Sequence, residues 1–376
     1  MQPLNGIFVL DFSTLLPGPL ATLMLAEAGA EVLKIERPGQ GDEMRSYAPR
    51  VGPDSINFQL LNRRKQSLEI DLKDPGAVAR LTPLIEKADV LVEQFRPQVM
   101  QRLGLGYEAV RTINPRLIYC SITGWGQSGP KSAAAGHDLN YLAETGVLAL
   151  SAGPDGIPSL PPVLAADIAG GSYPAVINIL LALRERELTG QGTHLDVAMS
   201  DGVFTFAYWA LGNAVAANAW PRSGQELLTG GSPRYQVYRT ADHRHVAAAP
   251  LEEKFWSNFC RVINLPEALR SPQAPAAAVI AQVAAIIASK TADEWRRAFA
   301  GQDVCCSIVL DFEEAVGDAH TVARRVFEQQ LQAEGQLLPA LPVPISPQFR
   351  SQELCAKAPR LGEHDDDLGI TRESAP

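Results

Sequence analysis

The segment that decides the fold is IFVLDFSTLLPGPLATLMLAEAGAEVLKIE, residues 7–36. Its two ends, IFVLDF and EVLKIE, are short apolar runs of the kind that forms buried parallel strands. Between them, Pro17 and Pro19 open a helix and Gly29 closes it, because proline suits the first helical turn and glycine the position after the last one. The segment therefore predicts a β-α-β unit.

The same alternation continues through the first half of the chain. Apolar strand-like runs recur at 67–72, 89–95, 116–123 and 193–199. Helical patterns lie between these runs, the longest of them over 173–188. Strands that alternate with helices predict an α/β fold with a parallel sheet and right-handed crossovers.

The composition changes after residue 200. An apolar helix expected over 203–217 leads into a more polar stretch that is richer in glycine. A hairpin, amphipathic helices and a short strand follow, which is the pattern of a separate α+β domain. We therefore expect a large α/β domain (1–200), a linker (201–232), a small α+β domain (233–325) and a C-terminal segment that returns to the large domain (326–376).

Composition and charge argue against several function classes. The formal net charge of −9 is unfavourable for nucleic-acid binding. The five cysteines and six histidines show no metal-ligand spacing, so no metal site is expected, and the odd number of cysteines suits reduced thiols in the cytoplasm. No uncharged apolar run approaches the roughly 18 residues of a membrane span, so no membrane crossing is expected. The first β-α turn also lacks the glycines of a dinucleotide-binding fold.

His137 and Asp167 are the candidates for acid–base chemistry. Both are expected at strand-to-helix junctions, where side chains and free backbone N–H groups face a cleft. Gly170 and Gly171 beside Asp167 allow a ligand or another backbone to come close. Structural roles stay open at this point, because an aspartate before a helix often caps it and a lone histidine is often only a hydrogen-bonded residue.

Basic residues lie beside several strand ends in the first third of the chain: Lys34, Arg37, Arg45, Arg63, Arg64, Lys65, Arg96 and Arg102. Arg37 and Arg96 each follow a strand directly, which places them at the carboxyl edge of a parallel sheet, where ligands bind. They are candidate anchors for a phosphorylated cofactor, and solvated surface charge is the alternative. Glu252, near the start of an amphipathic helix, is either an acid favoured by the helix dipole or a small-domain carboxylate that reaches the cleft.

Eight segments in order carry a family resemblance: LDFSTLLPGPLAT, GAEVLKIERPGQGD, LNRRKQSLEIDLK, DVLVEQFRPQVMQRLGLGY, INPRLIYCSITGWGQSGP, GHDLNY, RERELTGQGTHLDVAMSDG and APRLGEHDDDL. Together they resemble the family III CoA-transferases, the CaiB/BaiF group, which also contains the α-methylacyl-CoA racemases. The racemase branch is the more similar in its motifs. GHDLNY supplies a basic histidine, LEEKFW a partner carboxylate and GGSPRYQVYRTAD a matching segment.

The resemblance implies a Rossmann-like large domain that binds coenzyme A as part of its substrate, with no tightly bound cofactor. It also implies a small inserted domain and an interlocked homodimer. The catalytic residues that it implies are Asp167, His137 and Glu252 as the partner of the histidine. The implied CoA-binding positions are Arg37, Gln94, Arg96, Arg102, Leu103, Gly136, Asp138 and Tyr141.

Two chemistries share this family scaffold. A racemase removes the C2 proton of a 2-methylacyl-CoA with one base and returns a proton to the opposite face with another. A transferase uses the aspartate as a nucleophile and moves CoA to a carboxylic acid acceptor. Arg234 and Glu253 depart from the racemase pattern, and an arginine at 234 is a candidate carboxylate ligand, which keeps CoA transfer open. A CoA-binding protein without activity is the remaining alternative.

Overall fold

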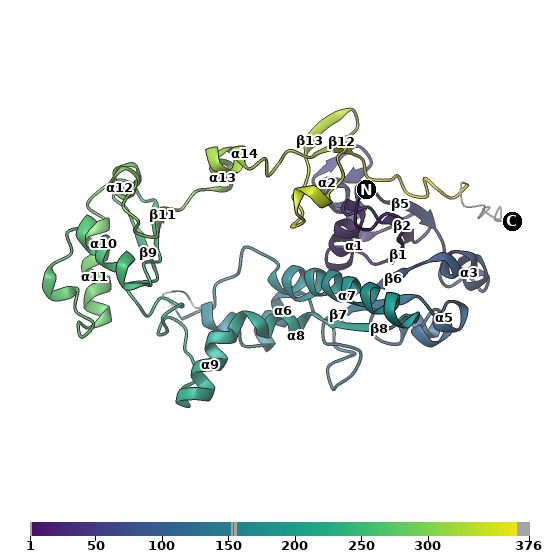
Figure 1. Ribbon diagram of the computed structural model, residues 1–376, viewed down its shortest axis with the longest axis horizontal. Coiled ribbons are helices and arrows are strands. Elements are labelled where there is room, and N and C mark those ends of the chain that lie inside the picture. Colours follow the sequence, from purple (N-terminus) through teal and green to yellow (C-terminus); the bar gives the residue numbers. More distant parts are fainter. Residues whose placement is uncertain (1, 152, 154–155, 367–376) are drawn as a thin grey trace. The chain divides into compact units, whose positions relative to one another are not determined.

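The computed structural model describes residues 2–151, 153 and 156–366 (Figure 1). The chain falls into two compact units. The first is built from Met1–Thr145, Pro162–Phe206 and His320–Pro376, and the second from Gly146–Pro161 and Ala207–Ala319. Residues 201–232, which we expected as a linker, are thus divided between the two units at Phe206.

A six-stranded parallel sheet forms the centre of the first unit. Its strands are β1 (Phe8–Phe12), β2 (Glu31–Glu36), β5 (Gln66–Glu69), β6 (Val90–Glu93), β7 (Ile118–Thr123) and β8 (His194–Ala198). Their order is β5-β2-β1-β6-β7-β8, and every neighbouring pair is parallel, which confirms the expected α/β fold. The strand order reverses between β1 and β6. Open parallel sheets bind ligands at such a point, outside the carboxyl ends of the strands.

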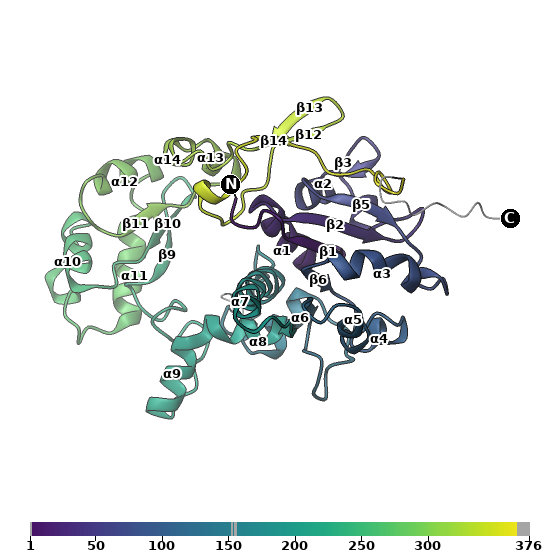
Figure 2. The same cartoon turned by 45° about the vertical axis from the view of Figure 1, so that its right-hand side comes forward.

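Helices cover both faces of this sheet because its side chains alternate between two apolar layers. Leu10 packs in one core cluster with Leu81 of α3 (Ala77–Lys87) and Val110 of α5 (Tyr107–Ile113). The next residue along β1, Asp11, points the other way and accepts a hydrogen bond from Thr22 of α1. Helix α1 (Pro17–Glu27) packs beside α7 (Tyr173–Thr189) (Figure 2).

Shorter elements complete the first unit. They are β3 (Arg50–Val51), β4 (Asp54–Ser55), α2 (Ile56–Asn62), α4 (Val99–Arg102), α6 (Asp138–Glu144), α8 (Met199–Val203), β12 (Gln330–Ala333), β13 (Gln336–Pro339) and β14 (Cys355–Ala356). The C-terminal segment reaches the edge strand β5. There the His364 N–H donates to the Ser67 carbonyl at 3.1 Å, and Asp365 Oδ1 accepts from the Glu69 N–H at 3.0 Å.

The second unit is an α+β structure with its own core. Its antiparallel sheet has the order β11-β10-β9. The elements are α9 (Tyr208–Ala217), β9 (Gln236–Arg239), β10 (His245–Ala248), α10 (Glu253–Val262), α11 (Ala276–Ile287), α12 (Ala292–Phe299), β11 (Cys306–Ile308), α13 (Phe312–Gly317) and, at the boundary of the units, α14 (Ala319–Ala323). Trp256, Phe259, Trp295 and Phe299 are buried together between these helices and the sheet.

Two helical segments differ from the sequence-based expectation. The apolar helix expected over 203–217 is interrupted, because α8 ends at Val203 and a 3₁₀ turn, Phe204–Ala207, precedes α9. Helix α7 continues backwards through a π-helical segment, so that 24 helical residues run from Ala166 to Thr189. By length and composition this stretch could cross a membrane, which we had not expected of any segment. Core helices of α/β domains pass the same test, and α7 buries Ala175, Ile179 and Ala182.

Buried ion pairs take up most of the basic residues at the strand ends. Lys34 pairs with Asp42 at 3.0 Å, Arg45 with Glu36 at 2.8 Å, Arg63 with Glu27 at 2.7 Å and Lys65 with Asp11 at 3.1 Å. Arg64 contacts Glu27 and Glu353. These five basic residues therefore balance carboxylates inside the fold, whereas the two candidate phosphate anchors, Arg37 and Arg96, are not among them. The sequence shows that a basic residue lies beside a strand end. It does not show which carboxylate the folded chain places next to that residue.

Asp11 is the most connected of these buried charges. It is fully buried and accepts hydrogen bonds from the backbone and hydroxyl of Ser13 and from Thr22. Lys65 and Lys34 hold the pKa of Asp11 well below its usual range, against the desolvation that raises it. The ionised carboxylate is thus the direct partner of Lys65 and a further counter-charge for Lys34, whose own partner is Asp42.

We predict that Asp11→Asn destabilises the fold by about 3–5 kcal/mol, because it leaves the buried Lys65 without its paired carboxylate. Urea unfolding monitored by circular dichroism measures this loss. Glu187→Gln is the matched control: it removes the partner of Arg184 in a pair that is 67% exposed on both sides, and should cost less than about 1 kcal/mol. Equal losses in the two variants would contradict the assignment of Asp11 as a core charge.

Candidate active site

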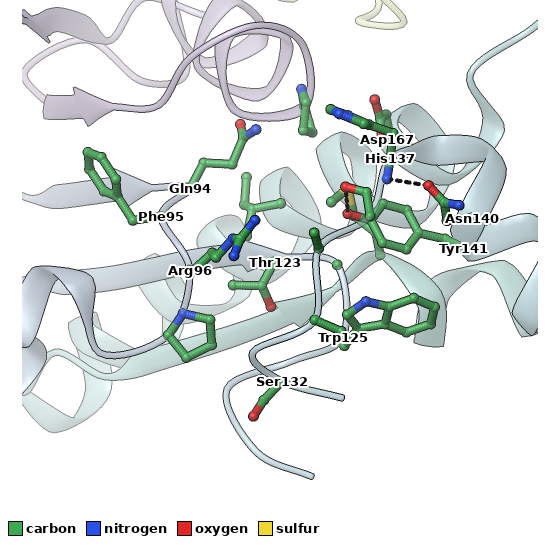
Figure 3. A pocket seen from close by; sticks show the side chains of 18 of the residues that line it. Gln94, Phe95, Arg96, Thr123, Trp125, Ser132, His137, Asn140, Tyr141 and Asp167 are labelled. Carbon is green, nitrogen blue, oxygen red and sulfur yellow. Dashed lines mark hydrogen bonds between the residues drawn. The ribbon is translucent and has the colours of Figure 1, made fainter. Parts of the chain in front are cut away.

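A cavity of about 400 Å³ opens at the carboxyl ends of β1, β6 and β7. We call it the site cavity (Figure 3). It is lined by Leu15, Pro17, Gln94, Phe95, Arg96, Pro97, Ile122, Thr123, Gly124, Trp125, Ser132, Ala134, Ala135, Gly136, His137, Asn140, Tyr141, Asp167 and Met199. Leu15 and Pro17 follow β1, and Gln94 to Pro97 follow β6. The cavity therefore lies where the strand order of the sheet reverses.

Asp167 reaches the cavity from a π-helical segment, Ala166–Ser172, and not from a strand-to-helix junction as the sequence suggested. The run before it forms no strand, and its helix begins after Ala165, so Asp167 is not the cap residue. The neighbouring Gly170 allows close backbone packing, because a Cβ there would lie 2.4 Å from the Met199 carbonyl oxygen. π-Helical turns are rare and often occur at functional sites.

A second carboxylate, that of Asp138, lies next to Asp167. The Oδ1 atom of the buried Asp138 accepts a hydrogen bond from the Asp167 N–H at 2.9 Å. Burial, together with the negative charge of Asp138, raises the pKa of Asp167 to about 6, and the opposing effect of His137 is smaller. Asp167 is thus a carboxyl group that can hold or release a proton near neutral pH.

His137 enters the cavity from the start of α6. It is the N-cap residue of that helix, and its backbone N–H donates to Asn140 Oδ1 at 3.0 Å. The imidazole is exposed and lines the same cavity as Asp167 (Figure 3). A base and an acid from two separate elements therefore face one space.

Tyr141 forms one wall and is held by its neighbours. Its hydroxyl donates to the Gly136 carbonyl at 2.6 Å, and its ring meets Trp125 edge-on with ring centroids 5.1 Å apart. A Cβ on Gly124 or Gly136 would lie under 3 Å from the tyrosine ring, so both positions require glycine. Burial, with the charges of Asp167 and Asp138, raises the pKa of Tyr141 to about 12, although the positive charge of Arg96 lowers it.

The loop after β6 supplies polar groups to the opposite wall. Gln94 Oε1 accepts from the Gly18 N–H at 2.9 Å, which ties this loop to the first turn of α1. Among the described residues, Arg96 forms no ion pair and is exposed. Its charge is therefore available to a ligand, unlike the buried arginines of the same unit.

The structure brings together most, but not all, of the residues expected at the site. Asp167, His137, Gln94, Arg96, Gly136 and Tyr141 line the site cavity, and Asp138 lies directly behind Asp167. Arg37 lines another cavity of about 670 Å³, the Arg37 cavity, together with Arg50 and Arg360. Arg102 and Leu103 lie at the end of α4 and are not among the residues that line either cavity.

Glu252 belongs to the second unit, where it is the N-cap residue of α10. Its pairing with His137 stays a prediction. Arg234, the candidate carboxylate ligand, contacts Glu253 at 2.7 Å and lies over the Trp256 ring at 5.0 Å. Its charge thus has a partner within its own unit.

Several cavity residues escaped the sequence analysis, chiefly Trp125, Asn140 and Met199. Trp125 is the second residue after β7, at the same sheet edge as Arg96, and this position was the available signal. The indole N–H of Trp125 is buried without a hydrogen-bond partner among the described residues. Within that same part of the chain, no cluster of three His, Cys, Asp or Glu side chains is placed to hold a metal ion.

Several known proteins are similar to this chain in sequence and in fold. A sequence model described as "CoA-transferase family III" matches residues 4–365. Human α-methylacyl-CoA racemase is 36% identical over 98% of this chain and 94% of its own length. Acetyl-CoA:oxalate CoA-transferase of Acetobacter aceti is 34% identical over 92% and 89%. A crystal structure of a CaiB/BaiF family protein from Brucella suis superposes with a TM-score of 0.83 at 27% identity, over 98% of both chains.

We predict that Asp138→Asn lowers the pKa of Asp167 below its value of about 6 by roughly half a unit or more. The amide keeps an acceptor for the Asp167 N–H, but the like charge is gone. Carbon-13 NMR of labelled aspartate measures the titration. Asp196→Asn is the control, since Asp196 is exposed on β8 and does not contribute to the shift of Asp167. A pKa that stays the same or rises in Asp138→Asn would refute the like-charge explanation.

Proposed function

Because this chain belongs to CoA-transferase family III, it is an enzyme of acyl-CoA chemistry, and we propose that it racemises 2-methylacyl-CoA thioesters at C2. Coenzyme A enters as part of the substrate, and no tightly bound cofactor is required. The observation that carries the proposal is that His137 and Asp167 come from separate elements and face one cavity.

Two-base proton transfer needs one group that is basic while the other carries a proton. Asp167 suits this role because its pKa of about 6 lies well above that of an ordinary aspartate. In one direction the carboxylate removes the C2 proton, an enolate forms, and the protonated His137 delivers a proton to the opposite face. The reverse direction exchanges the roles. The family resemblance assigns Glu252 as the carboxylate partner of His137, a role in which a carboxylate raises the basicity of an imidazole.

The carboxyl edge of the sheet offers a path for the CoA part of the substrate. Arg96 lies in the site cavity, and Arg37 follows β2, on the other side of β1. Arg50 and Arg360 line the Arg37 cavity beside it. We propose that the phosphates of CoA lie toward Arg37 and that the thioester lies toward Asp167.

CoA transfer is the second candidate, and similarity to acetyl-CoA:oxalate CoA-transferase favours it. In this chemistry an Asp167 oxygen attacks the thioester carbonyl, and CoA leaves as the thiolate. The thiolate then attacks the aspartyl carbonyl of the mixed anhydride and releases the acyl group as a carboxylate. An acceptor acid reverses both steps. The Arg234–Glu253 pair weighs against this candidate, because the arginine that was to bind an acid already has a carboxylate.

We also propose that the protein is a homodimer in the cytoplasm. Helix α9 exposes an apolar row in which Tyr208, Leu211 and Val215 are 72%, 61% and 78% exposed. Adjacent apolar side chains this exposed usually mark a protein interface.

Proton exchange on each pure enantiomer of a 2-methylacyl-CoA in deuterated water tests the racemase. We expect His137→Ala to exchange the C2 proton of one enantiomer only, because Asp167 still serves one face. Asp167→Asn should exchange only the other enantiomer. Mass spectrometry measures the deuterium. In the wild type, exchange by the Asp167 face should rise with pH through about 6, since the carboxyl must be ionised to act as a base.

The same samples distinguish the transferase. Equal loss of exchange on both enantiomers in both variants, with a hydroxylamine-trapped acyl group on Asp167 in the wild type, would exclude the two-base mechanism. A new CoA ester that forms only when succinate or another free acid is added would then support CoA transfer.

We predict that CoA raises the melting temperature. At a hundredfold excess over Kd the gain is about 2.7 kcal/mol, because CoA binds only the native state. Arg37→Ala should lose much of this gain, whereas Arg184→Ala, at an exposed arginine of α7, should keep it. The phosphate anchor is disproved by an Arg37→Ala protein that CoA stabilises as strongly as it does the wild type.

Sedimentation velocity should give a dimer of twice the 40.5 kDa chain mass at micromolar concentration. Leu211→Glu should shift the equilibrium to monomer, because a charge in an apolar interface cannot be solvated. Phe312→Glu, at an 80% exposed residue of α13, is the control and should remain a dimer. A monomeric wild type would contradict the interface.

A further inference from the structure

A second cavity of about 490 Å³ shares a wall with the site cavity. We call it the His194 cavity. It is lined by Glu93, Arg96, Pro97, Gln98, Met100, Gln101, Gly106, Tyr107, Glu108, Ala109, Tyr119, Ser121, Gln127 and His194. Arg96 and Pro97 line both cavities, so the Arg96 side chain stands between two spaces.

Glu93 fixes the loop that separates the cavities. It is the last residue of β6, its side chain is 4% exposed, and its Oε2 atom accepts from the Phe95 N–H at 2.8 Å. Residues 94–96 of that loop line the site cavity. The buried carboxyl group of Glu93, which lines the His194 cavity, thus holds the backbone of the loop that carries Gln94 and Arg96.

Glu93 is also the inner end of a hydrogen-bonded chain across three neighbouring strands. Its carboxyl group hydrogen-bonds with Ser121 of β7, and Ser121 Oγ lies 2.9 Å from Nε2 of His194 on β8. Ser121 is buried, whereas His194 is exposed. A hydroxyl group both donates and accepts, so the chain can run in either direction and can carry a proton between Glu93 and solvent.

Among the described residues, no cation forms an ion pair with Glu93. Burial, with a smaller contribution from the negative charge of Asp196 on β8, raises the pKa of Glu93 to about 7, although the hydrogen bonds from Ser121 and Phe95 lower it. The charge of Glu93 acts on Tyr119 and Cys120 of β7, two neutral groups whose own pKa values are raised chiefly by burial. From α5, Glu108 acts on His194, whose pKa is lowered chiefly by burial.

Arg96 is the permanent cation among the residues that line this cavity. In the structure its charge acts on Tyr141, in the site cavity, and does not contribute to the pKa of Glu93. Loss of the Glu93 proton would place an unpaired negative charge in the core beneath this arginine. Pairing with Arg96 would relieve that charge and withdraw the guanidinium from the site cavity.

We propose that Glu93 is a positioning residue for Arg96: it holds the loop through the Phe95 amide, and the proton that it exchanges through Ser121 and His194 decides which cavity Arg96 serves. This inference rests on the proposed function, in which Arg96 contacts an anionic group of the CoA substrate.

The coupling has a definite sign. A ligand anion that keeps Arg96 in the site cavity keeps the cation away from Glu93 and favours the protonated carboxyl group. Binding must then take up protons near pH 7, and the affinity must fall as the pH rises from 6 to 8. The loss of one charge-assisted contact corresponds to about tenfold in Kd.

Isothermal titration calorimetry with dephospho-CoA tests this coupling, because its diphosphate does not titrate near pH 7. Titrations at pH 6, 7 and 8, in buffers of different ionisation enthalpy, give both Kd and the protons bound. We expect the wild type to take up a fraction of a proton at pH 7 and to bind about tenfold more weakly at pH 8 than at pH 6. Asp167 also titrates near pH 6 in the site cavity, so the comparison is made in an Asp167→Asn background, where Glu93→Gln should show neither effect.

Two further variants keep the test decisive. Glu108→Gln removes an exposed carboxylate from the same cavity and should behave like the wild type. Ser121→Ala removes a hydrogen bond that lowers the pKa of Glu93, so its affinity change should move to higher pH. Proton uptake that persists in Glu93→Gln, or an unmoved transition in Ser121→Ala, would overturn the proposal. A wild type that binds no dephospho-CoA at any pH would overturn the proposed CoA site itself.

Discussion

The buried charges beneath the end of β1 are the constraint on which the site depends. Asp11 accepts from Ser13 and Thr22 and pairs with Lys65, while Lys34 donates to the Ser13 carbonyl at 2.6 Å. These contacts fix the chain where it leaves the central strand. Two residues later, Leu15 has a φ of 61°, which an ordinary side chain disfavours, and its N–H donates to Asp42 at 3.1 Å. A loop in this conformation needs partners that hold it in place.

The loop after β1, held in this way, forms one edge of the site cavity. Leu15 and Pro17 line it directly, and the first turn of α1 binds Gln94 from the neighbouring strand end. The loops after β1 and β6 are therefore joined across the point where the strand order reverses. The site is built on rigid strand ends, which suits chemistry in which two groups must address opposite faces of one carbon.

Negative charges near the site raise the pKa values of neighbouring carboxyl groups, and these effects matter as much as the ion pairs between opposite charges. Asp138 supports the Asp167 backbone through a hydrogen bond and also raises the pKa of its carboxyl group. Glu93 plays a related part behind the loop of Arg96, where burial keeps a carboxyl group near its neutral form. In each case a buried acidic side chain holds the backbone next to the site through a hydrogen bond to a main-chain N–H.

The amino-acid sequence by itself determined the parallel sheet, the position of Arg37 and Arg96 at strand ends and the nomination of His137 and Asp167. These features follow from local periodicity and from motifs that lie along the chain. Only the tertiary structure showed that Lys34, Arg45, Arg63, Arg64 and Lys65 are internal charges, that Asp167 lies in a π-helical turn, and that Arg96 borders two cavities. The physical reason is that the energy of a charge depends on its surroundings. Those surroundings, such as Glu27 beside Arg63 or Asp138 beside Asp167, come from residues that are distant in sequence and meet only when the chain folds.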